Sequence, residues 1–456
     1  MVGPKKTDIM ISGKVSSVLF SLVLPMILGM FALLVINLVD AYYIGKLGVN
    51  HLAAISFSFP VFFTVMSFNI GIAIGTSATV SRYIGAGDLN NAKLMISNIL
   101  LFIILFTSIV SIIGLISISP LFKLLGANSS HLPLVEDYMS IWYLGAPFFG
   151  FLVIANSILR AKGDAVTPSM IILLTSTVNA FLDPILIFGF GPINAMGIKG
   201  AAVATSISYV SGMLGMLLIL YNRKLVSFPT LKFYALLSSC KPIFLIGLPA
   251  GFTMMLNPIV LALVNKIVSY HGSSAVAAFG VGLRIESLAT IGIIAISSSL
   301  TPFLGQNIGA VKMDRIKSAL YYSIIFSLIW GLAVAIPLIL FSESISRIFS
   351  DEIEVQTTII KYLRIVSLSY IFWGWSNIAS AAFNGFQKPF HASIIYLSRL
   401  FVITIPFVII GNYYYDLIGI FYGIFWANVL SGIISVPWTR LLFKSKDRDF
   451  ELKLNR

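Results

Sequence analysis

The chain has 456 residues, of which 58% are hydrophobic and 10% are charged, and its mean hydropathy is +0.97. This composition excludes a soluble globular domain, because too few polar side chains remain to cover a water-facing surface. Apolar runs of about 20 residues, the length that crosses a hydrocarbon core of about 30 Å, recur along the whole sequence. Membrane β-barrels show short alternating segments instead. We therefore expect an all-α integral membrane protein.

The apolar runs predict twelve transmembrane helices. Their centres lie near residues 27, 66, 105, 147, 179, 210, 255, 290, 328, 371, 401 and 428. The polar, basic stretch "MVGPKKTDIMISGK" leads into the first span without a small-residue cleavage site, so we expect no cleaved signal peptide.

The positive-inside rule explains the net charge of +13 better than nucleic-acid binding does. We expect no nucleic-acid partner. Twenty-one Lys and Arg residues lie in the N-terminus, the even-to-odd loops and the C-terminus, and five lie in the opposite loops. The remaining four lie in or at the edges of spans: Lys266, Arg284, Arg364 and Arg399. We expect a multi-pass protein of the inner or plasma membrane, with both termini in the cytoplasm.

The two halves of the sequence align at a shift of 224 residues. Pro25 falls on Pro249, and "IGA" at 84–86 falls on "IGA" at 308–310; near the end of each half the register slips by one. Six spans per unit give both units the same orientation, which is the parallel-repeat layout of transporters. We predict lobes at 1–220 and 241–456, joined by a cytoplasmic linker at 221–240 that is either an amphipathic surface helix or a plain loop.

Intramembrane carboxylates are the leading functional candidates, because a charge at a helix centre costs about 2.5–3.5 kcal/mol on insertion scales. Of seventeen acidic residues, fourteen fall in tails, loops or span ends, which leaves Asp40, Asp183 and Glu286. Asp40 follows Asn37 by three residues, and Asp183 follows Asn179 by four, so each carboxylate shares a helical face with an amide.

Asn156 and Thr205 add oxygen ligands in the same half. The repeat counterparts of Asp40 and Asp183 are Val264 and Phe407, so the fold itself does not require these carboxylates. Two carboxylates in a low dielectric cannot both stay charged, so a proton or a hard cation such as Na⁺ is expected there. The alternative is that each merely caps or hydrogen-bonds a neighbouring helix.

A second candidate site in the other half consists of Glu286, Arg284 and Gln306. Glu286 is either a second coupling site, a substrate counter-ion or part of a structural ion pair, with Arg284 two residues away as a candidate partner. The aromatic stretch "YIFWGWSN" at 370–377 fits ligand stacking or simple packing.

Enzymatic constellations are not expected. The four histidines stand in separate loop regions, Cys240 is the single cysteine, and no Gly-Lys-Ser/Thr phosphate loop occurs. We expect no enzyme activity and no cofactor, with energy supplied by an ion gradient.

Six stretches carry a family resemblance. In chain order they are "NLVDAYYIGKLGVNHLAAIS", "VSRYIGAGDLNNAK", "ILRAKGDAVTP", "NAFLDPILIFGFG", "GIKGAAVATSIS" and "LTPFLGQNIGA". Together with the duplication they make the chain similar, over nearly its full length, to the multidrug and toxic compound extrusion (MATE) transporters, and within them to the DinF-like branch. The MATE fold of two parallel-repeat lobes is thereby implied.

The resemblance implies a coupling network of Asp40, Asn179, Asp183 and Thr205, which would hold H⁺ or Na⁺, with Asn37, Tyr138 and Asn156 nearby. It departs from the NorM-like branch, whose coupling carboxylates lie in the seventh and tenth spans, because those spans carry none here.

The implied function is an antiporter, expected as a monomer in the lipid bilayer, that exports amphipathic organic cations or aromatic drugs. Two other classes remain. A flippase for a lipid-linked precursor would need cationic residues for pyrophosphate, with Arg284, Arg364 and Arg399 as the candidates. A non-transporting membrane scaffold would have no need of buried carboxylates.

Overall fold

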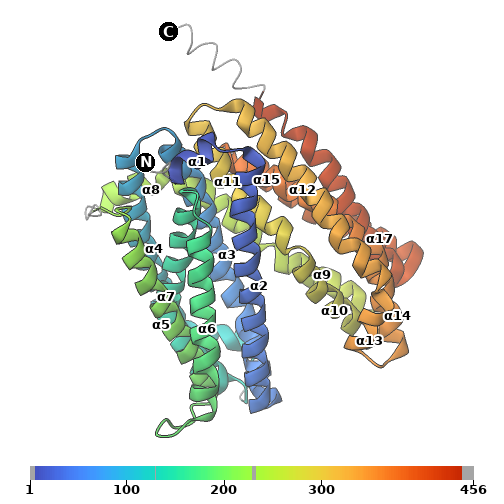
Figure 1. The fold of residues 1–456 in the computed structure, drawn as a ribbon. Helices are drawn as coiled ribbons and strands as arrows, with labels where there is room; N and C mark the ends of the chain where they lie inside the picture. Colours follow the sequence, from blue (N-terminus) through green and yellow to red (C-terminus); the bar gives the residue numbers. More distant parts are fainter. Residues whose placement is uncertain (1–5, 129, 228–232, 444–456) are drawn as a thin grey trace. The chain divides into compact units, whose positions relative to one another are not determined.

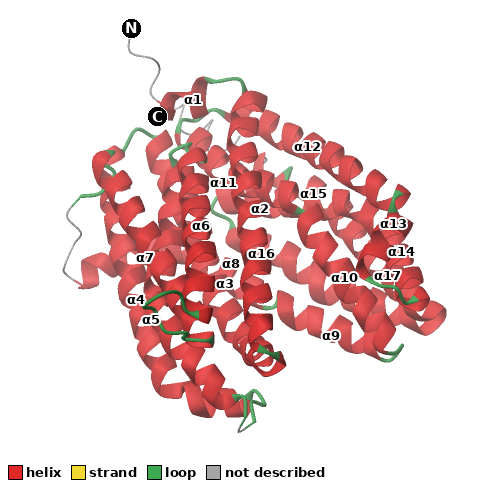
Figure 2. Cartoon of the chain, turned by 60° about the horizontal axis from the view of Figure 1, so that its bottom comes forward, coloured by secondary structure: helices red, strands yellow, loops and turns green. Residues whose placement is uncertain are grey.

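The computed structural model describes residues 6–128, 130–227 and 233–443, and these are almost entirely helical (Figure 2). The helices, labelled in Figure 1, are α1 (Lys6–Ser12), α2 (Val15–Leu47), α3 (Val49–Gly85), α4 (Leu89–Leu124), α5 (Leu132–Ala161), α6 (Val166–Phe188), α7 (Ile198–Asn222), α8 (Phe233–Met255), α9 (Asn257–Ser269), α10 (Ser273–Ala289), α11 (Ile291–Gly309), α12 (Met313–Leu340), α13 (Ser342–Phe349), α14 (Ile353–Val366), η1 (Ser367–Ser369), α15 (Tyr370–Gly385), α16 (Pro389–Leu397), η2 (Ser398–Thr404) and α17 (Ile405–Trp438).

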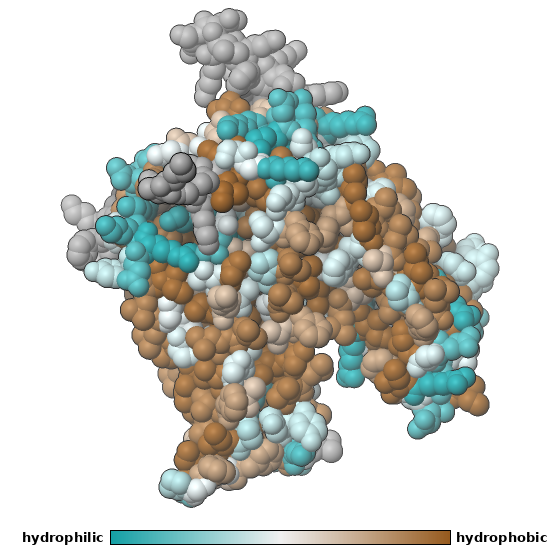
Figure 3. All heavy atoms as spheres, viewed as in Figure 1, coloured by the Kyte–Doolittle hydropathy of each residue, from teal (hydrophilic) through white to brown (hydrophobic). Residues whose placement is uncertain are grey.

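Ten helical segments of the described residues are long and apolar enough to cross a membrane. The last of them, Pro389–Phe443, contains a backbone break at Tyr415 and Asp416, so it covers the predicted spans centred near 401 and 428. The span predicted near 371 falls on α14 and α15, which η1 separates. Large apolar side chains cover much of the visible surface (Figure 3), as contact with lipid requires. The predicted all-helical membrane fold is confirmed.

The 224-residue repeat is visible in the backbone itself. Residues with positive φ recur at that shift: Gly48 with Gly272, Gly87 with Val311, and Gly163 with Gln387. A positive φ is unfavourable for a β-branched residue, and yet Val311, at φ 59°, keeps the backbone conformation of its counterpart Gly87. The two halves therefore place the same turns at equivalent positions.

The second half interrupts helices that the first half keeps continuous. Helix α3 corresponds to α10 plus α11, α4 to α12 plus α13, and α5 to α14, η1 and α15. Carbonyls freed at such breaks need donors, because no water reaches them in a bilayer core. Trp330 Nε1 donates to the carbonyl of Ala289, the last residue of α10, at 2.9 Å.

The chain divides into two compact units. Unit 1 contains the described residues of Met1–Val23 and Phe252–Arg456, and unit 2 is Leu24–Gly251. The boundaries cut α2 and α8, each beside a proline of the repeat, Pro25 and Pro249. The predicted lobes, 1–220 and 241–456, use other boundaries, and the linker predicted at 221–240 includes residues 228–232, which lie outside the described part.

The first helix belongs to unit 1 because second-half side chains satisfy its last carbonyls. Asn307 Nδ2 and Arg315 each donate to the Met10 carbonyl at 3.1 Å, and Lys312 Nζ donates to the Ile11 carbonyl at 2.9 Å. The final carbonyls of a helix have no intrahelical donor, and they favour cations through the helix dipole. The N-terminal segment is thereby tied to α11 and α12.

In unit 2, helix α7 begins directly against the last turn of α6. The Met196 and Gly197 amides donate to the Leu186 and Ile187 carbonyls at 2.9 and 3.1 Å. A Cβ atom added at Gly200 would meet the backbone of Leu186. This close approach holds α6 and α7 together near Asp183.

We predict that Gly200→Ala lowers the free energy of unfolding by about 1–3 kcal/mol, because the added methyl group overpacks the α6–α7 contact. Thermal unfolding in detergent, followed through the buried thiol of the single cysteine, Cys240, measures the effect. Gly45→Ala is the matched control, since a Cβ there meets nothing within 4 Å. Equal melting temperatures for both variants would contradict the prediction.

Candidate functional site

Asp40 on α2 and Asp183 on α6 come together in unit 2. Their carboxyl groups lie within hydrogen-bonding range of one another. Asp183 is 1% exposed and Asp40 is half-buried. Asp40 Oδ1 and Asp183 Oδ2 are buried without a hydrogen-bond donor among the described residues. The pair that the sequence singled out is therefore in direct contact.

The pair lies near one end of the unit 2 bundle. Asp40, Tyr138, Asp183 and Thr205 each stand five to seven residues from the end of their own helix, α2, α5, α6 and α7 respectively. At 1.5 Å per residue this places all four roughly 8–11 Å from that end. A buried apolar cluster packs there against Tyr138: Ile44, Ile187 and Ala201.

The three predicted amides have different positions. Asn179 Nδ2 donates to Asp183 Oδ1 at 3.3 Å, as the four-residue spacing predicted. Asn37 is exposed on α2. Asn156 is buried on α5 with Oδ1 unpartnered among the described residues, but it lies eighteen residues after Tyr138, about 27 Å along the helix. Asn156 is therefore remote from the carboxyl pair.

Two tyrosines lie within electrostatic range of the pair. The phenol of Tyr138 lies within electrostatic range of both carboxyl groups, and that of Tyr209 within range of Asp40. Sequence reasoning missed Tyr209, although it follows Thr205 by four residues on α7 and so shares its helical face. Thr205 itself is half-buried at the depth of the pair.

The chemistry of the pair follows from its oxygens. Two carboxylates in contact repel strongly in a low dielectric, and neither orphaned oxygen has a protein donor. One proton allows the carboxyls to hydrogen-bond each other, and a hard cation bridges them through the same oxygens. No group of three or more His, Cys, Asp or Glu residues forms in the described ranges, so a cation would also need amide or hydroxyl oxygens.

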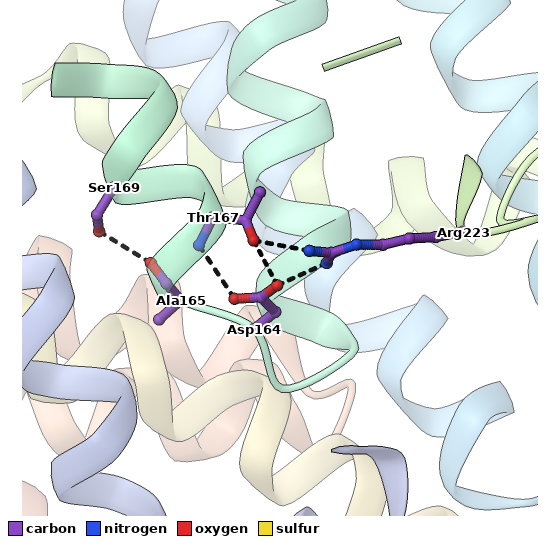
Figure 4. Close-up of polar contacts among 5 residues, drawn as sticks. All are labelled: Asp164, Ala165, Thr167, Ser169 and Arg223. Carbon is purple, nitrogen blue, oxygen red and sulfur yellow. Dashed lines mark hydrogen bonds and ion pairs between the residues drawn. The ribbon is translucent and has the colours of Figure 1, made fainter. Parts of the chain in front are cut away.

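The helices that carry the pair are anchored at their far ends. Gly29 on α2 packs against Ser169 on α6, where an added Cβ would lie 3.1–3.3 Å from that serine. Arg223, just after α7, bonds Asp164 at 2.5 Å and Thr167 Oγ1 at 2.8 Å (Figure 4). Thr167 donates both its amide and its hydroxyl to Asp164. This ion pair fixes the start of α6 against the end of α7.

Burial alone would raise the pKa of Asp164, but hydrogen bonds from Thr167 and the Arg223 guanidinium bring it below the ordinary value of 3.8. The pKa of Lys162 is also lowered, by burial and by repulsion from the nearby cations Arg223 and Lys93. The carboxylate of Asp164 is thus the counter-charge of a basic cluster.

Glu286 on α10 belongs to a separate buried network in unit 1. Tyr362 donates its hydroxyl to Glu286 Oε2 at 2.6 Å, and Arg399 on η2 lies within electrostatic range of the carboxyl group. Arg399 also contacts Asn428 Oδ1 at 3.5 Å, and Asn428 donates to Ser369 at 3.0 Å. The cation near Glu286 is therefore Arg399.

The other two members of the predicted second site lie apart from this network's carboxyl group. Arg284 is exposed and forms no ion pair with Glu286 in the part of the chain that the structure describes. Gln306 is fully buried on α11. Glu286 follows Arg284 by two positions, and this spacing turns their side chains to different faces of the helix.

The two networks use equivalent positions of the repeat. Tyr362 is the counterpart of Tyr138 at the 224-residue shift, and Asn428 is the counterpart of Thr205 after the register slip. Each half therefore surrounds buried carboxyl groups with a tyrosine and a hydroxyl or amide from the same helices. The carboxylates themselves come from different helices, α2 and α6 in one half and α10 in the other.

A duplicated bundle of membrane-crossing helices with buried carboxyl groups defines a membrane transport protein. The sequence profile of the MatE family matches the chain twice, at residues 25–185 and 249–410, and the starts of the two matches are 224 residues apart, as in the internal repeat. The chain belongs to the MATE transporter family. The predicted family is confirmed, and the protein is a transporter and not an enzyme.

Similar proteins support the same assignment. A FAD transporter of Shewanella oneidensis is 36% identical over 93% of this chain and 94% of its own length. A probable multidrug resistance protein, YoeA of Bacillus subtilis, is 27% identical over 90% of each chain. The outward-facing structure of a multidrug resistance MATE transporter of the MOP superfamily superposes with a TM-score of 0.91, 26% identity and coverage of 98% and 99%.

We predict that Asp164→Asn destabilises unit 2 on the order of 1 kcal/mol near neutral pH, because an ion pair with half-exposed Arg223 is partly screened. Since the folded pKa of Asp164 lies below 3.8, its contribution is present above pH 3.8 and is lost as the pH falls through the folded value. Melting temperatures of both proteins should therefore converge on acidification. A constant difference at all pH values would contradict this assignment.

We predict that Tyr362→Phe costs about 1–3 kcal/mol of stability, because Glu286 Oε2 loses its buried donor. The double variant Tyr362→Phe/Glu286→Gln should recover part of the loss, since a neutral amide tolerates the missing donor better than a carboxylate. The Cys240 thiol assay gives the comparison. If the double variant recovers no stability, the loss in Tyr362→Phe comes from altered packing around residue 362 and not from the unpaired carboxyl oxygen of Glu286.

Proposed function

We propose that this transporter is an antiporter that exports amphipathic organic compounds in exchange for H⁺ or Na⁺ through the carboxyl pair of unit 2. The contact between Asp40 and Asp183, with two orphaned oxygens, carries the proposal. A proton would be shared between the two carboxyls. Na⁺ would take oxygens from Asp40, Asn179, Asp183 and Thr205, with Tyr138 beside them.

The coupling would act through α2. Loss of the bound cation leaves two negative charges in contact, and their repulsion drives α2 and α6 apart until a cation returns. Helix α2 also contributes its first turns to unit 1, because the unit boundary falls between Val23 and Leu24. A shift of the Asp40 end is therefore transmitted along one helix that both units share. Along this helix, Gly29 packs against Ser169 of α6, and Pro25 removes one backbone hydrogen-bond donor.

The membrane arrangement is part of the proposal. Both termini and the linker at 221–240 lie in the cytoplasm, by the positive-inside distribution of Lys and Arg. The two halves act as lobes at 1–220 and 241–456, and the chain works as a monomer. The carboxyl pair then lies toward the outer side of the membrane, where the cation concentration that drives export is high.

Two substrate classes have support. Amphipathic cations and aromatic drugs are favoured by the relatives named as multidrug resistance proteins. A flavin dinucleotide is favoured by the 36% identical FAD transporter. A flippase for a lipid-linked precursor is the remaining alternative, and it would be supported by transport of a lipid-linked pyrophosphate without export of either soluble class.

We predict that Asp40→Asn and Asp183→Asn each reduce gradient-driven export of a fluorescent dye to the rate of protein-free vesicles, because the pair no longer exchanges a charge. Proteoliposomes are tested with a pH gradient alone and with a Na⁺ gradient alone, which identifies the coupling ion. Asp351→Asn, in an exposed loop, is the matched control. Wild-type rates for both site variants, at equal protein per vesicle, would refute the proposed coupling site.

A further inference from the structure

Helix α10 carries a guanidinium that is unpaired among the described residues, and with α11 it corresponds by the repeat to α3, a candidate membrane span. Arg284 is exposed, and it forms no ion pair, hydrogen bond or ring contact within residues 6–128, 130–227 and 233–443. The nearby carboxyl group of Glu286 is already occupied by Tyr362. Arg284 therefore has no internal partner that accounts for its charge.

Arg284 falls within the repeat counterpart of the candidate membrane span Asn50–Gly85. Helices α10 and α11 run from residue 273 to 309 with a break at Thr290, and together they replace the continuous α3 of the first half (Figure 1). Arg284 lies seven residues from the middle of this pair, about 10 Å along the axis. The hydrocarbon core extends about 15 Å to either side of its centre. A free guanidinium at that depth is costly in lipid and is stable where water or an anion reaches it.

The face of α10 that carries Arg284 is made mostly of small and polar residues. Positions spaced by three and four residues put these residues on one side of the helix: Ser273, Ala277, Gly280, Val281, Arg284, Ser287 and Leu288. Two of the seven, Val281 and Leu288, are larger apolar residues. The exposed side of α12 differs, with Leu328, Ile329, Leu332, Ile336 and Leu340. The α12 face is thus the more apolar of the two and the better suited to lipid.

The same face offers room beside the charge. A Cβ added at Gly280, one turn before Arg284, would meet no atom within 4 Å. The repeat counterpart of Arg284 is Pro60, so the fold does not require a cation at this position. An open surface next to a free guanidinium fits an anionic group of a ligand. Arginine binds phosphate oxygens through two parallel N–H donors, a geometry that an ammonium group cannot reproduce.

We propose that Arg284 binds a phosphate group of the exported substrate, and that the substrates include phosphate-bearing aromatic compounds of the dinucleotide class. This inference rests on the proposed export function. Charge complementarity and the open face of α10 carry it, and the similarity to a FAD transporter agrees with it. Arg284 would thus be a specificity-determining residue, separate from the carboxyl pair that couples transport to the ion.

Binding of FAD and of riboflavin to the full-length protein in detergent tests the proposal, because the two ligands share the flavin ring and differ by the pyrophosphate and adenosine. The wild type should bind FAD at least about tenfold more tightly than riboflavin, as expected for a charge-assisted contact of 1.5–3 kcal/mol. Arg284→Ala should bring the ratio of the two dissociation constants close to one. Arg284→Lys should restore the ratio in part, since it keeps the charge without the paired donors.

Arg347→Ala, at an exposed arginine of α13, is the control and should leave the ratio unchanged. A ratio that Arg284→Ala does not lower, or a wild type that binds FAD no better than riboflavin, would overturn the inference. Dye export by the wild type and by the Arg284→Ala protein under an ion gradient separates the two proposals. Absence of dye export by the wild type would count against the export function, whereas a retained FAD preference in the variant counts only against the role of Arg284.

Discussion

The contact between the Asp40 and Asp183 carboxyl groups is the interaction on which the functional interpretation depends. Two negative charges cannot remain in contact within a bundle of apolar helices, so the state of the pair is tied to an external proton or cation. The rest of unit 2 maintains this contact. Gly29 and Gly200 bring α2 and α7 close to α6, and the Asp164–Arg223 ion pair holds the far ends of α6 and α7. A binding event at one pair of oxygens is therefore linked to the packing of three helices.

Duplication provided the same framework twice, and the two halves have diverged in backbone and in charge. The first half has continuous helices with two carboxylates on α2 and α6, whereas the second has broken helices around a neutralised network of Glu286, Tyr362 and Arg399. Helix interruptions in membrane proteins are tolerated where neighbouring side chains satisfy the backbone, as Trp330 does at Ala289. This asymmetry fits the proposed division of roles, with the coupling ion in one half and the substrate contact at Arg284 in the other.

Much of the candidate site could be predicted from spacing along single helices. The pairing of Asn179 with Asp183 follows from four residues of separation, and the two aspartates were the only charges of their half that no loop explained. Contacts between different helices could not be predicted in this way. Asn156 is about 27 Å from Tyr138 along α5, Tyr209 lies within electrostatic range of Asp40, and the cation near Glu286 is Arg399 rather than Arg284. None of these follows from sequence, because the rotation and depth of one helix against another depend on packing.

Composition and periodicity by themselves determined a duplicated helical membrane protein with two carboxylates in one half, because lipid permits few charges and few backbone forms. Tertiary structure alone decided that the two carboxylates touch, since Asp40 and Asp183 are 143 residues apart in sequence and only the packing of α2 on α6 joins them. It also decided that Glu286 is paired and Arg284 is free. The physical reason is the same in each case: sequence spacing sets the face of a helix, and the neighbouring helix sets what that face meets.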